Sequence, residues 1–419
     1  MRAGTRRVAA ALVAAAASVV LIAPPAHADQ VREMEYWLHE YGITQAWNTT
    51  RGAGVTIAVI DSGIDSSHPD LAGAVVGGAD FSGFGAPDGQ RPVGSGGGRA
   101  HATMVASLAA GRGSAPGVGV IGVAPQASLL SISVGFGEGT RNSDDQIADA
   151  VRWAADNGAD VINMSLTRNT LDWPTSWDDA FLYAMERDVV IVAAAGNRGS
   201  GTVEVGAPAT MPGVLTVAGL SRSGTASFDA SSQGITIGVA APAEDLVGAA
   251  PDGSHVTWQG SSGATPIVAG VVALVMAAHP ELSAGAVIDR ITQTARDAGA
   301  PGPDPLYGNG ILDAAAAVRG TVESSGVEPA EQLREWIRLH RRAPVEEEPA
   351  TTPQPVVPAP EVEPAPVPQA RGPVGELLPT VNELRLVGIP LLVLGGFSAA
   401  AIALGVGAAR HVRRQRAGE

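Results

Sequence analysis

The sequence predicts an α/β fold in which a parallel β-sheet carries helices on both faces. Along residues 31–322, short runs rich in Val, Ile and Ala alternate with segments of helical periodicity. The chain has 419 residues and 53 glycines, with a hydrophobic fraction of 45% and an aromatic fraction of only 4%. A core of small aliphatic side chains suits closely packed strands and helices.

Five runs are predicted to be buried strands because they are short, apolar and bounded by turn-forming residues. They are GVTIAVIDSG (54–63), ASLLSISV (127–134), ADVINMSL (159–166), DVVIVAAAGN (188–197) and GVLTVAG (213–219). Helices are predicted for NSDDQIADAVRWAADNG (142–158), WDDAFLYAMERD (177–188) and GATPIVAGVVALVMAAHP (263–280). In such folds, functional groups gather at the carboxyl ends of the strands. The residues that follow these strands are therefore the first candidates for a functional site.

The N-terminus has the layout of a signal peptide. Three arginines precede an apolar run over residues 8–23, and the small residues Ala26 and Ala28 suit the −3 and −1 positions of a cleavage site. We expect a signal peptide over residues 1–28, cleaved after Ala28. The rest of the body is then exported.

A second apolar segment lies near the C-terminus. Residues 386–409 carry no charge and would span roughly 36 Å as a helix, which is enough to cross a bilayer with some tilt. The tail over residues 410–419 contains four arginines and marks the cytoplasmic side. We expect a single-pass protein of the cell membrane, with the body outside and the C-terminus in the cytoplasm.

The remaining segments connect the body to this anchor. Residues 29–50 are expected to form an N-terminal extension, and residues 51–322 one globular domain. Residues 323–342 are predicted to form a short amphipathic helix that docks on the body, with a partner site as the alternative. Residues 343–385 combine proline with small and acidic residues, which predicts an extended spacer.

The composition excludes several classes of function. The formal net charge is −15 and the central region has no basic stripe, which argues against nucleic-acid binding. The chain has no cysteine, so disulfides, a cysteine nucleophile and thiolate–zinc sites are excluded. No metal site and no cofactor are indicated. A structural calcium ion is compatible with the sequence, but no ligand set for it can be read.

Four polar residues follow predicted strands or begin predicted helices. Asp61 ends the first strand, Asn197 ends the strand at 188–197, His101 precedes a helix of small residues, and Ser262 begins an apolar helix. Taken singly, each has an ordinary explanation as a turn, surface or helix-capping residue. Together they supply the acid, base, amide donor and nucleophile that acyl transfer requires.

The residues around these four resemble the motifs of the subtilisin-like serine proteases, the subtilase or peptidase S8 family. The family patterns D-[ST]-G, H-G-T-x-V-A, A-A-G-N and G-T-S-x-A-x-P read here as DSG, HATMVA, AAGN and GSSGATP, in the same order. The resemblance covers residues 31–318 and includes SSHPDL, VIGVAP and YGNGILDAAAAV. It implies a subtilisin-like parallel sheet and a catalytic domain over residues 51–322.

The resemblance also implies the roles of the four residues in a serine endopeptidase. Ser262 would attack the scissile carbonyl, His101 would take and return the proton, and Asp61 would orient the imidazole. Asn197, together with the backbone N–H of Ser262, would stabilise the oxyanion.

The resemblance further implies that two segments contact an extended peptide, one by pairing with it as an added strand and one across the primary pocket. The first is Ser165, Leu166 and Thr167, and the second is Ala194, Ala195 and Gly196. The sequence departs from the family at Ala102 and Thr167, where Gly is usual or common, at Ser261, where Thr is usual, and at Gly263, where bulkier residues are frequent.

The layout of the chain further resembles the mycosins, membrane-anchored subtilases associated with type VII secretion in actinobacteria. The shared features are a proline-rich spacer, a C-terminal apolar segment with a basic tail, and a segment after Ala28 that is too short for an independent inhibitory propeptide. The resemblance implies a peptide or protein substrate and a type VII membrane complex as a partner. The alternatives are a generic surface-anchored degradative subtilase and a catalytically weak scaffold of a membrane secretion complex.

Overall fold

The computed structural model describes residues 30–136 and 141–341. These residues belong to one compact unit. The predicted signal peptide, proline-rich spacer, membrane helix and basic tail lie outside the described residues.

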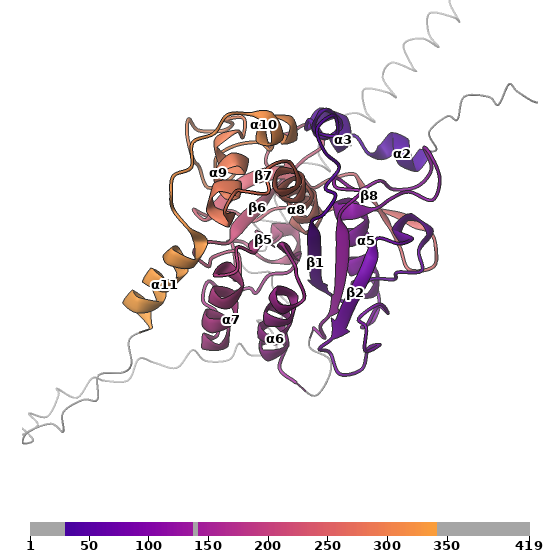
Figure 1. The fold of residues 1–419 in the computed structure, drawn as a ribbon, viewed down its shortest axis with the longest axis horizontal. Helices are drawn as coiled ribbons and strands as arrows, with labels where there is room; N and C mark the ends of the chain where they lie inside the picture. The colour runs from indigo at the N-terminus through magenta and orange to yellow at the C-terminus, as the bar shows by residue number, and fades with distance from the viewer. Residues whose placement is uncertain (1–29, 137–140, 342–419) are drawn as a thin grey trace, which may run out of the picture. The chain divides into compact units, whose positions relative to one another are not determined.

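The centre of the unit is a seven-stranded parallel sheet with the strand order β2-β3-β1-β4-β5-β6-β7 (Figure 1). Its strands are β1 (Thr56–Asp61), β2 (Val75–Asp80), β3 (Ser128–Ser133), β4 (Val161–Met164), β5 (Val190–Ala194), β6 (Leu215–Leu220) and β7 (Ile237–Pro242). A separate antiparallel hairpin contains β8 (Leu246–Ala249) and β9 (His255–Trp258). The predicted strands coincide with β1 and β3 to β6, whereas β2, β7 and the hairpin were missed.

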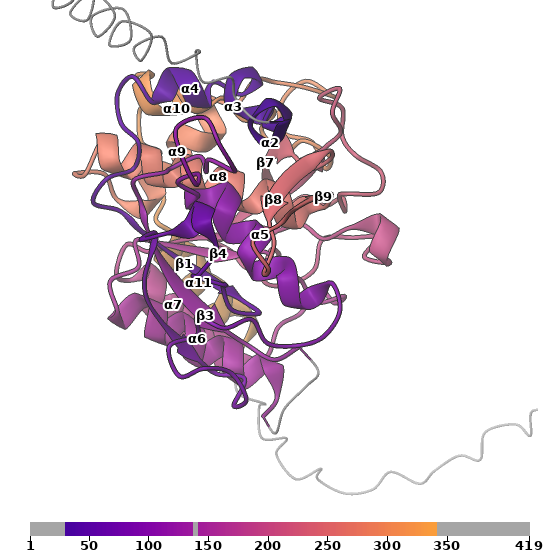
Figure 2. The same cartoon turned by 90° about the vertical axis from the view of Figure 1, so that its right-hand side faces the viewer.

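Helices cover both faces of the sheet, which confirms the predicted fold class. The helices are α2 (Gln30–Met34), α3 (Trp37–Glu40), α4 (Ile43–Ala46), α5 (Gly98–Ala110), α6 (Ser143–Asp156), α7 (Thr175–Met185), α8 (Ser261–Ala278), α9 (Ala284–Gln293), α10 (Ala314–Arg319) and α11 (Pro329–His340). Short 3-10 turns form η1 (Pro69–Leu71) and η2 (Arg198–Ser200). Helices α5 and α8 pack together on one face, and α6 and α7 lie on the other (Figures 1 and 2).

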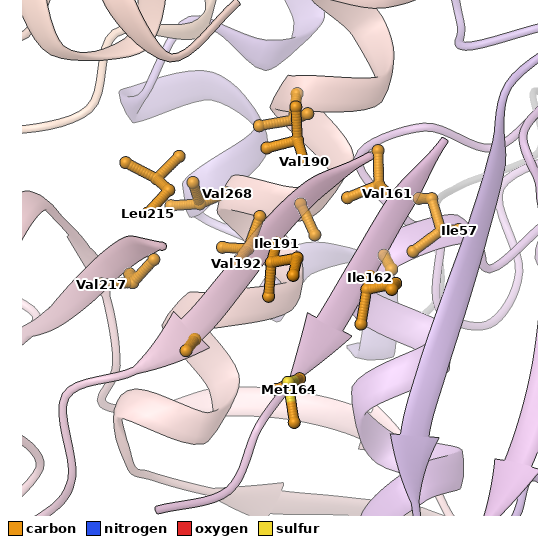
Figure 3. Packing of buried hydrophobic residues seen from close by; sticks show 14 of the residues in the cluster. Ile57, Val161, Ile162, Met164, Val190, Ile191, Val192, Leu215, Val217 and Val268 are labelled. Atoms are coloured by element: carbon orange, nitrogen blue, oxygen red, sulfur yellow. The ribbon is translucent and has the colours of Figure 1, made fainter. Parts of the chain in front are cut away.

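The core lies between the sheet and α8. Figure 3 shows aliphatic side chains of neighbouring strands packed side by side, with Val268 of α8 close to Val192 and Leu215. Of the helices in residues 30–136 and 141–341, α8 alone is long and apolar enough to span a membrane, with a mean hydropathy of 1.7. This helix packs against the sheet and is largely buried, and burial in the core accounts for its apolar sequence.

The segments that flank the domain pack against it. In the N-terminal segment, Trp37 and Ile43 are fully buried. In α11, Leu333 is buried and the Trp336 ring lies 4.2 Å from the Trp173 ring, centroid to centroid. The apolar side of α11 therefore contacts the body, where α11 packs against α7.

Candidate active site

An aspartate and a histidine meet at the carboxyl edge of the sheet. β1 pairs with β3 on one side and with β4 on the other, so the strand order reverses at β1. In α/β folds, ligands bind beside such a reversal, at the carboxyl ends of the strands. Asp61 is the last residue of β1, and His101 lies in the first turn of α5. The imidazole Nδ1 lies 2.7 Å from Asp61 Oδ2, and the backbone N–H of Ser62 donates to Asp61 Oδ1 at 2.7 Å.

Burial and charge act on His101 in opposite directions. Burial alone lowers the pKa of His101, but the charge of Asp61 and the hydrogen bond to it outweigh burial, so the pKa lies above its usual 6.5. The indole of Trp258 stands edge-on to the imidazole, with the ring centroids 5.8 Å apart. The imidazole is therefore held on one side by a carboxylate and on another by an aromatic ring.

Ser262 lies in the first turn of α8. The residue at the N-cap is Gly260, and no side chain caps this helix end, so an explanation of the serines as helix caps is wrong. Ser262 Oγ donates to the carbonyl oxygen of Ser165 at 3.1 Å. Among the described residues, it makes no hydrogen bond to His101. The hydroxyl of Ser262 is half-buried and directed toward the end of β4.

The neighbouring serine has a different environment. Ser261 is fully buried, and its single hydroxyl proton has two acceptors within reach, Gly196 O at 2.9 Å and Asn197 Oδ1 at 3.0 Å. The backbone N–H of Ser261 also donates to Asn197 Oδ1, at 2.8 Å. Because the amide oxygen of Asn197 is held in this way, its Nδ2 group remains as a donor and lies next to Gly260.

Two polar side chains that the sequence analysis did not assign to this role support the start of α8. Asn163 Nδ2, inside β4, donates to Ser165 Oγ at 3.0 Å, and Ser165 Oγ donates to the carbonyl of Ser262 at 2.8 Å. Asn163 is fully buried. The sequence did contain a signal for this role, which is an asparagine within an otherwise aliphatic strand. A buried amide requires hydrogen-bond partners, so such an asparagine indicates a polar contact at that position.

A cleft of about 310 Å³ opens beside the pair of Asp61 and His101. Its lining includes Ser165, Leu166 and Thr167, the segment for which pairing with a peptide is expected. The sequence analysis missed the other residues of the lining. They are Gly98, Phe136, Ser143, Asp144, Ile147 and Arg168.

The second predicted segment is buried below the surface. Ala194 and Ala195 are 1% and 0% exposed. The N–H of Gly196 donates to Ser261 Oγ at 3.1 Å, and its carbonyl accepts from the N–H of Ser232 at 2.7 Å. These residues therefore lie behind Asn197 and fix its position, and they do not line the cleft that contains His101.

Two of the departures from the family pattern have structural explanations. A Cβ atom on Gly263 would lie 2.3 Å from Leu246 Cδ1 and 3.3 Å from the indole of Trp258, so the hairpin already fills that space. Ala102 is fully buried in the core behind His101, and its methyl group is not on the cleft wall. Both residues fit their surroundings.

Comparison with known proteins extends the similarity over most of the chain. Residues 52–310 match the subtilase family, peptidase S8. Subtilisin E of Bacillus subtilis (strain 168) is 38% identical over 285 residues, which cover 67% of this chain and 68% of that protein.

Solved structures give the same result. MycP1 from the ESX-1 type VII secretion system has a TM-score of 0.60 and 32% identity, covering 72% of this chain and 88% of MycP1. Fervidolysin from Fervidobacterium pennivorans, a keratinolytic enzyme related to subtilisin, has a TM-score of 0.59 and 29% identity, covering 70% of this chain and 48% of fervidolysin. The fold and these matches define a serine endopeptidase of the α/β class. The chain belongs to the subtilase family.

Proposed function

We propose that Asp61, His101 and Ser262 are the catalytic triad of this endopeptidase and that Asn197 is its oxyanion donor. The observation that carries the proposal is the 2.7 Å bond between His101 Nδ1 and Asp61 Oδ2 at the carboxyl edge of the sheet, beside a cleft to which Ser165 contributes. Ser165 in turn bonds to both the hydroxyl and the carbonyl of Ser262. These contacts support the assignment of the acid, the base and the nucleophile to one site.

In the proposed reaction, Ser262 Oγ first leaves the Ser165 carbonyl and donates to His101 Nε2. It attacks the scissile carbonyl carbon while the imidazole takes its proton, and Asp61 stabilises the resulting imidazolium. Asn197 Nδ2 and the N–H of Ser262 donate to the oxyanion. The imidazolium then protonates the leaving amine, and water attacks the acyl-enzyme with the same histidine as base, which releases the acid product and regenerates the serine.

An extended peptide is the substrate class that this site suits. Residues 165–167 continue from β4 along the cleft, so their backbone can pair with a peptide as an added strand. Such pairing would bring a peptide N–H to the carbonyl of Ser165. In the absence of substrate, this carbonyl accepts the hydrogen bond from Ser262 Oγ. Substrate binding would then release the hydroxyl toward His101.

A fluorophosphonate probe tests the assignment of the nucleophile, because it reacts only with an activated serine. The full-length protein should be labelled, and the Ser262→Ala variant should not. Ser223→Ala is a matched control, because Ser223 is an exposed serine whose hydrogen bonds, among residues 30–136 and 141–341, stay within its own loop. Labelling that persists in Ser262→Ala would refute the assignment.

We further propose that the protein is a mycosin-like protease of the cell membrane that works with a type VII secretion complex. The likeness to MycP1 supports this proposal, together with the layout of spacer, apolar segment and basic tail in the sequence. An enzyme tethered beside a secretion channel gains effective concentration for emerging substrates. The proposed localisation is single-pass, with the catalytic domain outside and the C-terminus in the cytoplasm.

A competing function is broad protein degradation at the cell surface, which the similarity to subtilisin E and fervidolysin favours. Replacing residues 386–419 with an unrelated single-span anchor separates the two. If the chain works within a secretion complex, the anchor exchange should impair type VII export more than Ser262→Ala does. Normal export in a deletion strain, together with cleavage of casein by the protein, would favour degradation.

A further inference from the structure

A second cluster of ionisable side chains lies outside the proposed triad. His68 is the N-cap of η1, Asp70 lies within η1, and His255 begins β9 on the separate hairpin. Each residue offers one potential ligand atom, and these atoms all lie within 4.8 Å of one another. His68 and Asp70 are buried, whereas the His255 side chain is 24% exposed, so the cluster can be reached from solvent.

The carboxylate of Asp70 is only partly satisfied by protein groups. Its Oδ2 accepts from the N–H of Val120 at 2.7 Å and lies 2.6 Å from His255 Nε2. Its Oδ1 is buried and has no hydrogen-bond partner in residues 30–136 and 141–341. A buried carboxylate oxygen without a partner is costly, and a bound cation would compensate it.

The two imidazoles lie edge to face, with their ring centroids 5.4 Å apart. His68 Nδ1 accepts from the N–H of Asp70 at 3.1 Å, and His68 Nε2 faces the carbonyl of Ser254 at 3.1 Å. Metal binding at both Nε2 atoms would move each ring proton to Nδ1. His255 Nδ1 has no hydrogen-bond partner among the described residues, so its protonation breaks no hydrogen bond. Protonation of His68 Nδ1 would break the hydrogen bond that this atom accepts from the backbone N–H of Asp70.

From this geometry we propose that His68, Asp70 and His255 form a binding site for one divalent transition metal ion of the zinc type. Two imidazole nitrogens and a carboxylate oxygen are ligands that zinc accepts in tetrahedral sites, with solvent in the fourth position. Tetrahedral bonds of 2.0–2.1 Å place ligand atoms roughly 3.4 Å apart, so the hairpin closes slightly onto η1 when the ion binds. The nearby carboxylate of Asp252, in the hairpin turn, adds negative charge at the entrance.

The site would support the proposed triad indirectly. β9 runs from His255 to Trp258, the residue whose ring contacts His101, and α8 begins shortly afterwards at Ser261. An ion that ties His255 to η1 would fix this hairpin and hence the wall of the active site. Its expected effect is on the stability of the folded state, because the three ligands do not touch the proposed reacting atoms.

Binding can be measured without any activity assay. The full-length protein carrying Ser262→Ala, which prevents self-digestion, is dialysed to remove metals and titrated with Co²⁺, whose tetrahedral complexes absorb strongly in the visible range. Zinc at about one hundred times Kd should then raise Tm by roughly 5–10 °C. His255→Gln keeps a donor for Asp70 Oδ2 while removing the imidazole ligand, so it should fold but lose both signals.

His39→Gln is the matched control, because His39 is an exposed histidine on α3 outside the cluster, and it should keep both signals. Circular dichroism verifies that each variant is folded. The site is refuted if the parent shows no cobalt absorption and no zinc-dependent rise in Tm. It is also refuted if His255→Gln is folded and retains the same rise.

Discussion

The two halves of the proposed catalytic site are held in different ways. On β1 and α5, Asp61 and His101 already share a 2.7 Å hydrogen bond without substrate. On β4 and α8, the Ser262 hydroxyl donates to the Ser165 carbonyl instead of to the imidazole. The fold thus holds the acid and the base together in the absence of substrate. The hydroxyl of the nucleophile instead donates to a carbonyl that would accept from the backbone of a paired peptide.

This difference has a mechanistic consequence. The positions of Asp61 and His101 depend on strand β1 and on the packing of α5, which are fixed once the core forms. The orientation of Ser262 depends on one side-chain rotation, whose energy is small compared with that of the core. Catalytic hydrogen bonds often form only in the substrate complex. Substitutions in the two halves should therefore affect rate, pH dependence and stability to different extents.

The largest effect is expected for Ser262→Ala. Loss of the nucleophile should lower kcat by about 10⁶-fold, as in subtilisin. Stability should change little, because Ser262 does not cap α8 and makes a single hydrogen bond through its hydroxyl. Peptide hydrolysis and thermal unfolding measure the two quantities. A large fall in Tm would mean that the serine has a structural role that the half-buried hydroxyl does not indicate.

The next largest effect is expected for Asp61→Asn. Loss of the carboxylate that orients His101 should lower kcat by about 10⁴-fold. The charge of Asp61 raises the pKa of His101 against the effect of burial, so removing this charge should move the acid limb of kcat/KM to lower pH. An acid limb that stays in place would show that another group controls the titration.

The same shift determines how stability depends on pH. His101 has a higher pKa when folded than its unfolded value of about 6.5, so it stabilises the native state fully below that value. This contribution is lost as the pH rises through the folded pKa. The deficit of Asp61→Asn in Tm should therefore be larger at about pH 5.5 than at about pH 9.

Much of this site could be predicted from the sequence because its parts follow local signals. Asp61 ends the aliphatic strand β1, Asn197 follows β5, and Ser262 lies in the first turn of α8, so their positions at the sheet edge follow from the α/β pattern. Strand β2, with the sequence VVGGAD, was missed because it contains two glycines and little apolar alternation. Strand β9 was missed because its side chains are largely exposed.

Other features depend on contacts between distant segments, which a single sequence does not contain. Trp258 contacts His101, and His255 contacts Asp70, only because the β8–β9 hairpin folds over α5 and η1. The buried environment of Ser261 depends on Asn197, in the loop after β5. A motif can place a residue in chain order, but the packing of these loops decides which of two adjacent serines is buried.

A smaller effect is expected at Asn197, where the donor role can be separated from the structural one. Asn197→Asp keeps the oxygen that accepts from Ser261 but removes the Nδ2 donor. Loss of an oxyanion donor should lower kcat by about 10²–10³-fold. Asn197→Ala should show the same kinetic loss and also a lower Tm, because it leaves the backbone N–H of Ser261 without an acceptor, although the Ser261 hydroxyl keeps the carbonyl of Gly196. Equal kcat in the parent and in Asn197→Asp would exclude the oxyanion role.

The smallest effect is expected for Ala102→Gly, which restores the residue that the family usually has after the histidine. Ala102 is fully buried in α5, and the cleft is lined by other residues, so its methyl group does not meet the substrate. Glycine inside a helix costs about 1 kcal/mol relative to alanine, which corresponds to a fall in Tm of roughly 2–4 °C. We expect this fall in Tm, with kcat/KM unchanged. Tm is measured in the Ser262→Ala background, and kcat/KM is measured in the active enzyme. A rise in kcat/KM would instead show that the methyl group displaces His101, and that the acid–base half of the site is less completely assembled than its 2.7 Å bond indicates.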